Sequence, residues 1–177
     1  MYYQNQTLET VQDIITVSFN YMQNILGISL GTRLMGIAVL YNGELSDFRV
    51  RTFYGAWNTE KQKEMIDTIR QTISRYGITK IVVKTPKPFH CSQSINDLTS
   101  EILQLAEKLK IRIIICTITM LVRHNKDNEI SNKQSLIQSI IRKYPLHRRL
   151  ADLYAKERKN HTPYYVKLFE AIACTEM

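Results

Sequence analysis

Two short apolar segments punctuated by glycines constrain the fold of this chain more than any other feature. Residues 25–39 have the sequence ILGISLGTRLMGIAV, in which three glycines interrupt two apolar runs. A short apolar run bounded by turn residues is typical of a buried β-strand. Asn42-Gly43 then follows the second run, and this dipeptide favours a two-residue hairpin turn. We therefore predict three consecutive antiparallel strands, at about 24–30, 35–41 and 45–53.

The hydrophobic pattern then changes to alternating helices and strands. Apolar residues recur at three- and four-residue spacing before Gly77, which predicts a helix that Asn58 or Thr59 caps at its start. The run KIVVK predicts a buried strand, and IRIIICTI predicts a strand buried on both faces of a parallel sheet. These two strands span 80–84 and 111–118, and further helices are predicted at about 94–110, 132–143, 146–158 and 163–175. This order predicts an α/β fold with a five-stranded mixed sheet flanked by helices.

Length and composition favour a single domain. A chain of 177 residues with 44% hydrophobic residues is long enough to bury one core. Residues 1–20 are predicted to form an N-terminal arm or short helix, and residues 21–177 one domain. No apolar run approaches the ~20 residues that cross a bilayer. The three scattered cysteines lack disulfide or zinc spacing. We expect a cytoplasmic protein that is not associated with a membrane.

Basic residues exceed acidic residues, and the excess is concentrated toward the C-terminus. The chain has 24 Lys and Arg against 16 Asp and Glu, which gives a formal net charge of +8. Such clusters of basic residues suit contacts with a phosphate backbone. Most runs of charged residues are instead solvent-exposed helix surfaces, so both interpretations stay open. In this region the candidate nucleic-acid-binding residues are Arg142, Lys143, Arg148, Arg149, Arg158 and Lys159. Thr32 and Arg33, in the turn after the first strand, are further candidates because such turns contact phosphate, and a tight turn that closes the hairpin explains them equally well.

The opening strands resemble the first hairpin of the RNase H-like superfamily. The similarity is to the RuvC-type and YqgF-type Holliday-junction resolvases, whose first strand has the pattern G-x-D-x-G-x-R-x-x-G-x-A. Gly27, Gly31, Arg33, Gly36 and Ala38 match this pattern. The resemblance implies an RNase H-like domain with three antiparallel strands followed by parallel strands. It also implies phosphodiester cleavage by two Mg²⁺ ions held between carboxylates.

Most positions that hold carboxylates in those nucleases carry other residues here. Ser29 stands in place of the first-strand aspartate, and Lys84 in place of the fourth-strand glutamate. On the last helix the pattern D-x-x-D-A-x-A is matched with Lys167 at the first acid and Glu170 at the second. Residues 79–92 contain no Asp or Glu, so a shift in alignment does not restore the acid. We predict that Lys84 or Lys167 pairs with Glu170 and that no metal is bound.

Four functional hypotheses follow. The first is a RuvC-like pseudoenzyme that binds DNA or RNA without metal-dependent nuclease activity and needs no cofactor. The second is an active endonuclease, a Holliday-junction resolvase or structured-RNA nuclease, that uses Mg²⁺ and the relocated carboxylates Asp47, Glu44 or Asp97. The third is an ATPase of the sugar kinase and actin superfamily, which needs two such domains. The fourth is a structural protein, for which a homodimer is one form. We prefer the first because it explains the hairpin, the missing acids and the basic residues together.

Overall fold

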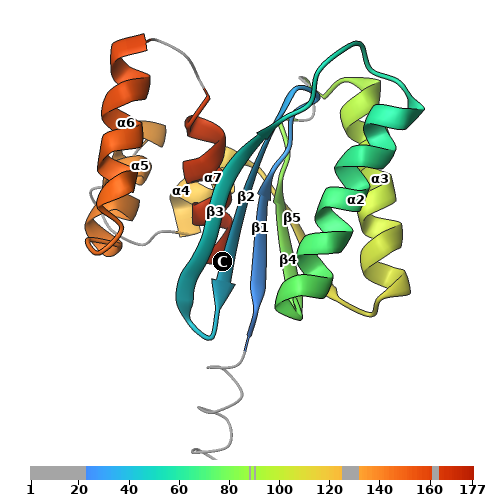
Figure 1. Ribbon diagram of the computed structural model, residues 1–177, viewed down its shortest axis with the longest axis horizontal. Helices are drawn as coiled ribbons and strands as arrows, with labels where there is room; N and C mark the ends of the chain where they lie inside the picture. Colours follow the sequence, from blue (N-terminus) through green and yellow to red (C-terminus); the bar gives the residue numbers. More distant parts are fainter. Residues whose placement is uncertain (1–22, 88, 90, 125–131, 161–163) are drawn as a thin grey trace, which may run out of the picture.

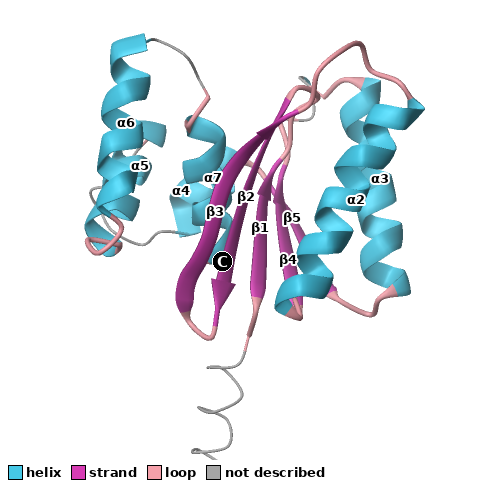
Figure 2. Ribbon diagram, in the orientation of Figure 1, coloured by secondary structure: helices cyan, strands magenta, loops and turns pink. Residues whose placement is uncertain are grey.

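The computed structural model of the protein describes most of the chain. The described residues are 23–87, 89, 91–124, 132–160 (backbone only for 157–160) and 164–177. They form one five-stranded sheet between two layers of helices (Figure 1, Figure 2). The predicted arm or helix at 1–20 lies outside the described residues. Within them, no helix is long and apolar enough to span a membrane, and the three cysteines are free thiols.

The first three strands form the antiparallel part of the sheet that the glycine pattern predicts. Asn42 (φ 51°) and Gly43 (φ 83°) both have positive φ, as a type I′ hairpin turn requires. The fourth and fifth strands add in parallel to the first, in the order β3-β2-β1-β4-β5. The predicted fold class is therefore confirmed. The strands are β1 (Ile25–Ser29), β2 (Leu34–Tyr41), β3 (Glu44–Thr52), β4 (Lys80–Lys84) and β5 (Arg112–Cys116).

Helices cover both faces of this sheet (Figure 1). One face packs against α2 (Thr59–Tyr76) and α3 (Gln93–Lys108). The other face carries α4 (Ile118–His124), α5 (Lys133–Lys143), α6 (Arg148–Asn160) and α7 (Val166–Thr175). Asn58 caps α2 by accepting a hydrogen bond from the backbone N–H of Lys61, and Gly77 ends the helix in the left-handed conformation. The helix ends predicted from these two residues are confirmed.

Two predictions about the segment after α3 are wrong. The strand predicted to be buried on both faces is the edge strand β5, whose first residue, Arg112, is exposed and whose three isoleucines are half-buried. An edge strand has a neighbour on one side only, so less of it is covered. The strand also ends at Cys116, and residues 118–124 form the helix α4. This short helix was not predicted because its apolar residues continue the pattern of the strand.

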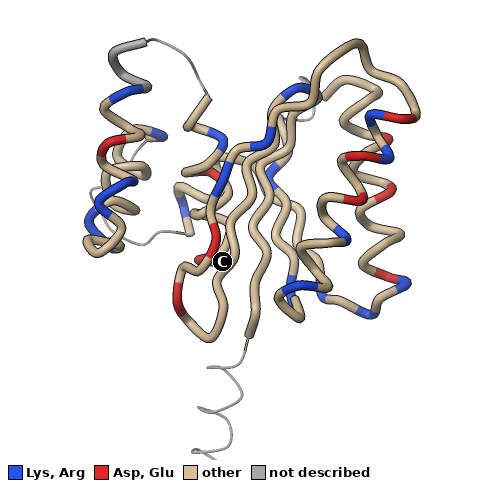
Figure 3. Tube along the Cα trace, viewed as in Figure 1, with Lys and Arg blue, Asp and Glu red and all other residues tan. Residues whose placement is uncertain are grey.

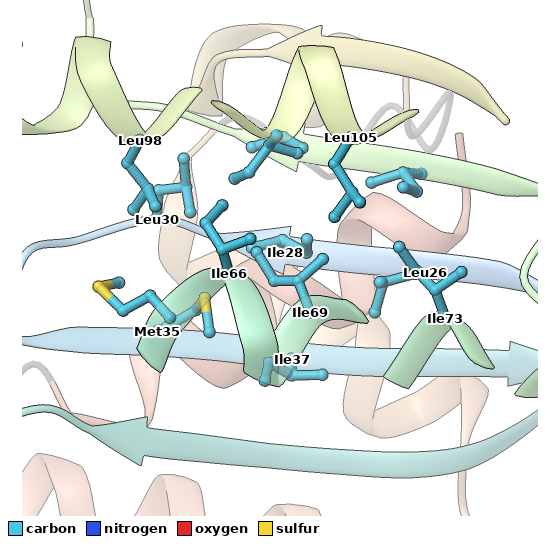
Figure 4. Close-up of a cluster of buried hydrophobic side chains, with 14 of the residues drawn as sticks. Leu26, Ile28, Leu30, Met35, Ile37, Ile66, Ile69, Ile73, Leu98 and Leu105 are labelled. Carbon is cyan, nitrogen blue, oxygen red and sulfur yellow. The ribbon is translucent and has the colours of Figure 1, made fainter. Parts of the chain in front are cut away.

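Two hydrophobic clusters lie on the two faces of the sheet. Leu26 and Ile28 of β1 pack with Ile69 and Leu98 in the cluster beneath α2 and α3 (Figure 4). Successive side chains of a strand point to opposite faces, so the residues between them face the other layer of helices. Ser29 therefore lies on the face that α7 covers. This alternation places the first of the predicted site residues beneath the last helix.

Candidate functional site

Helix α7 lies directly on β1 and β2 because glycines remove the side chains beneath it. A Cβ atom at Gly27 would lie 2.0 Å from the carbonyl oxygen of Ala171, and one at Gly36 would lie 1.9 Å from that of Lys167. Both distances are far shorter than a van der Waals contact, so this approach requires glycine at both positions. The two contacts bracket Glu170, whose side chain is consequently pressed against the sheet.

Glu170 is the centre of a buried polar cluster to which β1, β4, α5 and α7 contribute. The hydroxyl of Ser29 donates a hydrogen bond to Glu170 Oε2 at 2.6 Å, and Lys84 Nζ donates to the same oxygen at 2.9 Å. Lys133 Nζ lies 3.0 Å from the other oxygen, Oε1. Ser29 and Lys84 are partners in the parallel register of β1 and β4, which brings both side chains to one place. Both oxygens of the carboxylate are therefore in contact with lysine.

These neighbours keep Glu170 ionised although its side chain is only 2% exposed. Burial alone raises the pKa of this carboxyl group. The charge of Lys84, the hydrogen bond from Ser29 and the charge of Lys133 outweigh burial and lower the pKa of Glu170 to about 2. The ion pair predicted between Lys84 and Glu170 is confirmed.

Lys167, the other predicted partner, makes no direct ion pair with Glu170. Its ammonium group donates a hydrogen bond to the carbonyl oxygen of Leu30, and its side chain lies beside Gly31. Burial, followed by the charge of Lys84, lowers the pKa of Lys167 to about 8, although Glu170 offsets part of this effect. Lys133 lowers the same pKa further, so the three lysines interact. We name the group Ser29, Lys84, Lys133, Lys167 and Glu170 the Glu170 cluster.

Sequence reasoning missed Lys133. It begins α5 directly after Asn132, whose side chain accepts hydrogen bonds from the backbone N–H groups of Gln134 and Ser135. This cap fixes the first turn of α5, and the packing of α5 on α7 brings the lysine to Glu170. A lysine at the start of a helix is ordinarily a surface residue, and no motif surrounds this one. The only available signal was the need of a buried carboxylate for more than one partner.

The side chains of the Glu170 cluster do not fit a divalent metal ion. Mg²⁺ takes oxygen ligands and is held chiefly by carboxylates and waters. The cluster instead has one carboxylate, one hydroxyl and three ammonium groups, and the charged groups give a net charge of +2. Elsewhere in the described residues, no group of three or more His, Cys, Asp or Glu side chains is arranged to hold a metal.

The candidate relocated carboxylates do not join Glu170. Asp47 forms an ion pair with Arg49 of its own strand and accepts a hydrogen bond from the hydroxyl of Tyr76 in α2, which lies on the opposite face of the sheet from α7. Asp97 belongs to α3, which lies on the opposite face of the sheet from α7 (Figure 1). Glu44 is the first residue of β3, beside the β2–β3 hairpin and away from the β1–β2 turn. None of the three candidate positions is therefore close to the surviving acid.

Thr32 and Arg33 lie in the turn between β1 and β2, next to the Glu170 cluster. Arg33 is exposed, and its carbonyl oxygen accepts a hydrogen bond from the backbone N–H of Phe53 at 2.9 Å. The turn forms one wall of a cleft of about 340 Å³. Tyr54 and Trp57 line the cleft, and the ring of Tyr54 is largely exposed. An exposed cation therefore stands close to aromatic rings at this end of the sheet.

Figure 3 shows basic residues on the layer of helices that includes α5 and α6, and four of the remaining candidates lie around the connection between these two helices. The connection between α5 and α6 faces the β2–β3 hairpin across a groove, whereas Arg33 lies at the opposite end of β2. Lys143 is engaged within the protein, since its ammonium group pairs with the carboxylate of Glu176. Arg142, Lys143, Arg148 and Arg149 belong to this end of the molecule, and the side chains of Arg158 and Lys159 lie outside the described part.

Two solved structures of RuvC are similar to this chain. The structure of Thermus thermophilus RuvC has a TM-score of 0.57 and 11% identity, covering 67% of this chain and 78% of that chain. The structure of T. thermophilus RuvC in complex with a Holliday junction substrate has a TM-score of 0.63 and 11% identity, covering 86% and 90%. No protein-family model and no curated protein matches the sequence. At this identity the similarity shows the fold alone, and it confirms the predicted RNase H-like fold.

Proposed function

We propose that this protein binds nucleic acid on an RNase H-like scaffold and does not cleave it by two-metal chemistry. The observation that carries the proposal is that both carboxylate oxygens of Glu170 already have partners. Lys84 and Ser29 contact Oε2, and Lys133 contacts Oε1. In a two-metal nuclease the carboxylates must hold cations and offset their charge. Here a divalent cation would have to displace two ammonium groups and enter a cluster that is already positively charged.

Charge and surface chemistry support a nucleic-acid ligand. The formal net charge of +8 favours polyanions, because lysine and arginine contacts to phosphates dominate non-specific affinity. The cleft beside Arg33 combines a cation with the rings of Tyr54 and Trp57. Such a combination suits an unpaired nucleotide, whose base stacks on aromatic rings while its phosphate contacts arginine. We infer DNA or RNA as the partner. The YqgF-type resemblance, a homodimer and a cytoplasmic location stay predictions.

Binding measurements with a labelled four-way DNA junction and a hairpin RNA test this function. We expect fluorescence anisotropy to show binding that weakens steeply between about 50 and 200 mM salt, as counterion release requires. Arg33→Gln is expected to weaken binding and to reduce the salt slope by about one. Arg70→Gln is the matched control, because Arg70 is exposed on α2 and pairs with Asp67. Affinity that does not change with salt would contradict phosphate binding.

A cleavage assay on the same substrates tests the absence of two-metal chemistry. We expect no product from the four-way junction or the hairpin RNA with excess Mg²⁺ or Mn²⁺. A T. thermophilus RuvC preparation serves as the positive control on the junction. Metal-dependent cleavage by the wild-type protein would overturn the proposal and would favour the endonuclease hypothesis.

A further inference from the structure

The Glu170 cluster contains more positive charge than its single carboxylate neutralises. Lys84 and Glu170 form the buried pair, with side chains 9% and 2% exposed. Lys133 shares the same carboxylate, and no carboxylate of the described residues lies within ion-pair distance of Lys167. Like charges held together in a partly buried place repel one another more strongly than in water. The surplus therefore favours an anion as an additional partner.

The surplus charge is on the accessible side of the cluster. The Lys133 side chain is 46% exposed, and Lys167 is partly exposed beside the β1–β2 turn. Lys84 lies behind them with Glu170 and is almost fully buried. Thr32 and the exposed Arg33 follow Gly31, which lies against the Lys167 side chain. An anion that approaches from solvent would thus meet Lys133 and Lys167 first. The hydroxyl of Thr32 and the guanidinium group of Arg33 belong to the β1–β2 turn, which lies beside Lys167.

We propose that Lys133 and Lys167 bind a phosphate group, with the Lys84–Glu170 pair as the fixed support behind them. This inference rests on the proposed function, since it specifies where nucleic acid contacts the cluster. A net charge of +2 matches a phosphomonoester, which carries a charge of roughly −1.5 to −2 at neutral pH, and it also attracts a backbone phosphodiester. In this arrangement, the ammonium groups of Lys133 and Lys167 neutralise the phosphate without a metal ion between them.

Inorganic phosphate and a short oligonucleotide with or without a 5′-phosphate are the probes. Calorimetric titration at constant ionic strength is expected to show phosphate binding that Lys167→Gln and Lys133→Gln each weaken about tenfold. Lys63→Gln is the matched control, because Lys63 is exposed on α2, and it is expected to bind phosphate as the wild type does. Preference for the 5′-phosphorylated oligonucleotide would assign the site to strand ends, and equal binding would assign it to the backbone.

Nuclear magnetic resonance of Lys167 gives a readout that does not depend on nucleic acid. Its amine has a pKa of about 8 and faces Lys84, Lys133 and Glu170. A bound phosphate is expected to raise that pKa toward the ordinary 10.5, because the anion stabilises the charged form. An unchanged Lys167 resonance on saturation with phosphate, or equal affinity in Lys167→Gln, would overturn the site.

The two proposals fail in different ways. Junction binding that Lys133→Gln and Lys167→Gln leave unchanged would refute the phosphate site and retain the proposed function. Phosphate binding that moves the Lys167 resonance, in a protein that binds neither junction nor hairpin, would retain the site and refute nucleic-acid binding.

Discussion

Replacing Glu170 with glutamine is expected to destabilise the fold strongly. Glutamine keeps the size of the side chain but removes the charge, which leaves Lys84 only 9% exposed and without its counter-ion. Removing one partner of a buried pair costs about 3–5 kcal/mol. The lowering of the Glu170 pKa from 4.5 to about 2 corresponds to about 3 kcal/mol at neutral pH. In a chain of this size, that loss lowers Tm by roughly 6–20 °C.

Thermal unfolding followed by circular dichroism measures this loss. The control is Glu64→Gln, because Glu64 is half-exposed and pairs with Arg51 at 3.3 Å. Such a surface pair contributes at most about 1 kcal/mol. A double replacement of Lys84 with Met and Glu170 with Leu removes both buried charges and is expected to recover part of the stability. If Glu170→Gln lowers Tm no more than Glu64→Gln does, the buried pair is not a major contribution to stability.

The same carboxylate makes stability depend on pH in acid. The folded pKa of Glu170 is about 2 and the ordinary value is 4.5, so the unfolded chain takes up the proton first as the pH falls. The contribution of Glu170 is therefore complete above pH 4.5 and is lost as the pH falls toward 2. Urea unfolding should show the stabilities of the wild type and Glu170→Gln converging across this window. A constant difference would refute the assigned pKa.

Three substitutions test the surroundings of the carboxylate. Gly36→Ala is expected to lower the free energy of unfolding in urea by more than about 3 kcal/mol, because its Cβ would lie 1.9 Å from a backbone oxygen of α7. A smaller loss would show that α7 moves easily away from the sheet. Ser29→Ala is expected to cost about 1.5–3 kcal/mol and to raise the pKa of Glu170, which carboxyl resonances would follow. The wild type should gain stability relative to Lys167→Met as the pH rises from about 8 to 10.5, because the folded chain disfavours the charged lysine; a flat difference would contradict this.

Local chemistry explains which elements were predictable from sequence. Asn42-Gly43 selects its turn without help from distant residues, and Asn58 and Gly77 define α2 in the same way. The pairing of Lys84 with Glu170 spans 86 residues, yet it was predictable because the resemblance assigns both positions to one site. The family resemblance and the local turn and cap residues were therefore enough to predict the fold and the Lys84–Glu170 pair at the centre of the Glu170 cluster.

Features that depend on packing alone were not predictable. Lys133 reaches Glu170 only because α5 packs against α7, and nothing in its own segment indicates this. The basic residues beyond Lys143 are close in sequence to one another, but sequence order does not reveal at which end of the sheet they lie. Arg33 is at one end, whereas the α5–α6 connection is at the other. The turn that carries Arg33 and the basic residues around the α5–α6 connection are therefore two separate regions.

The close contact between α7 and the sheet explains why Glu170 needs positively charged partners. Gly27 and Gly36 fix the helix backbone against β1 and β2, and this packing buries Glu170 whatever its partners are. A buried carboxylate without a partner is too costly to retain as an anion. Metal ions and ammonium groups both meet that need, but they leave different residual charges. Carboxylates arranged for metals favour cations, whereas Lys84, Lys133 and Lys167 around one acid leave a surplus of positive charge. The same packing thus accommodates a site whose preferred ligand is an anion.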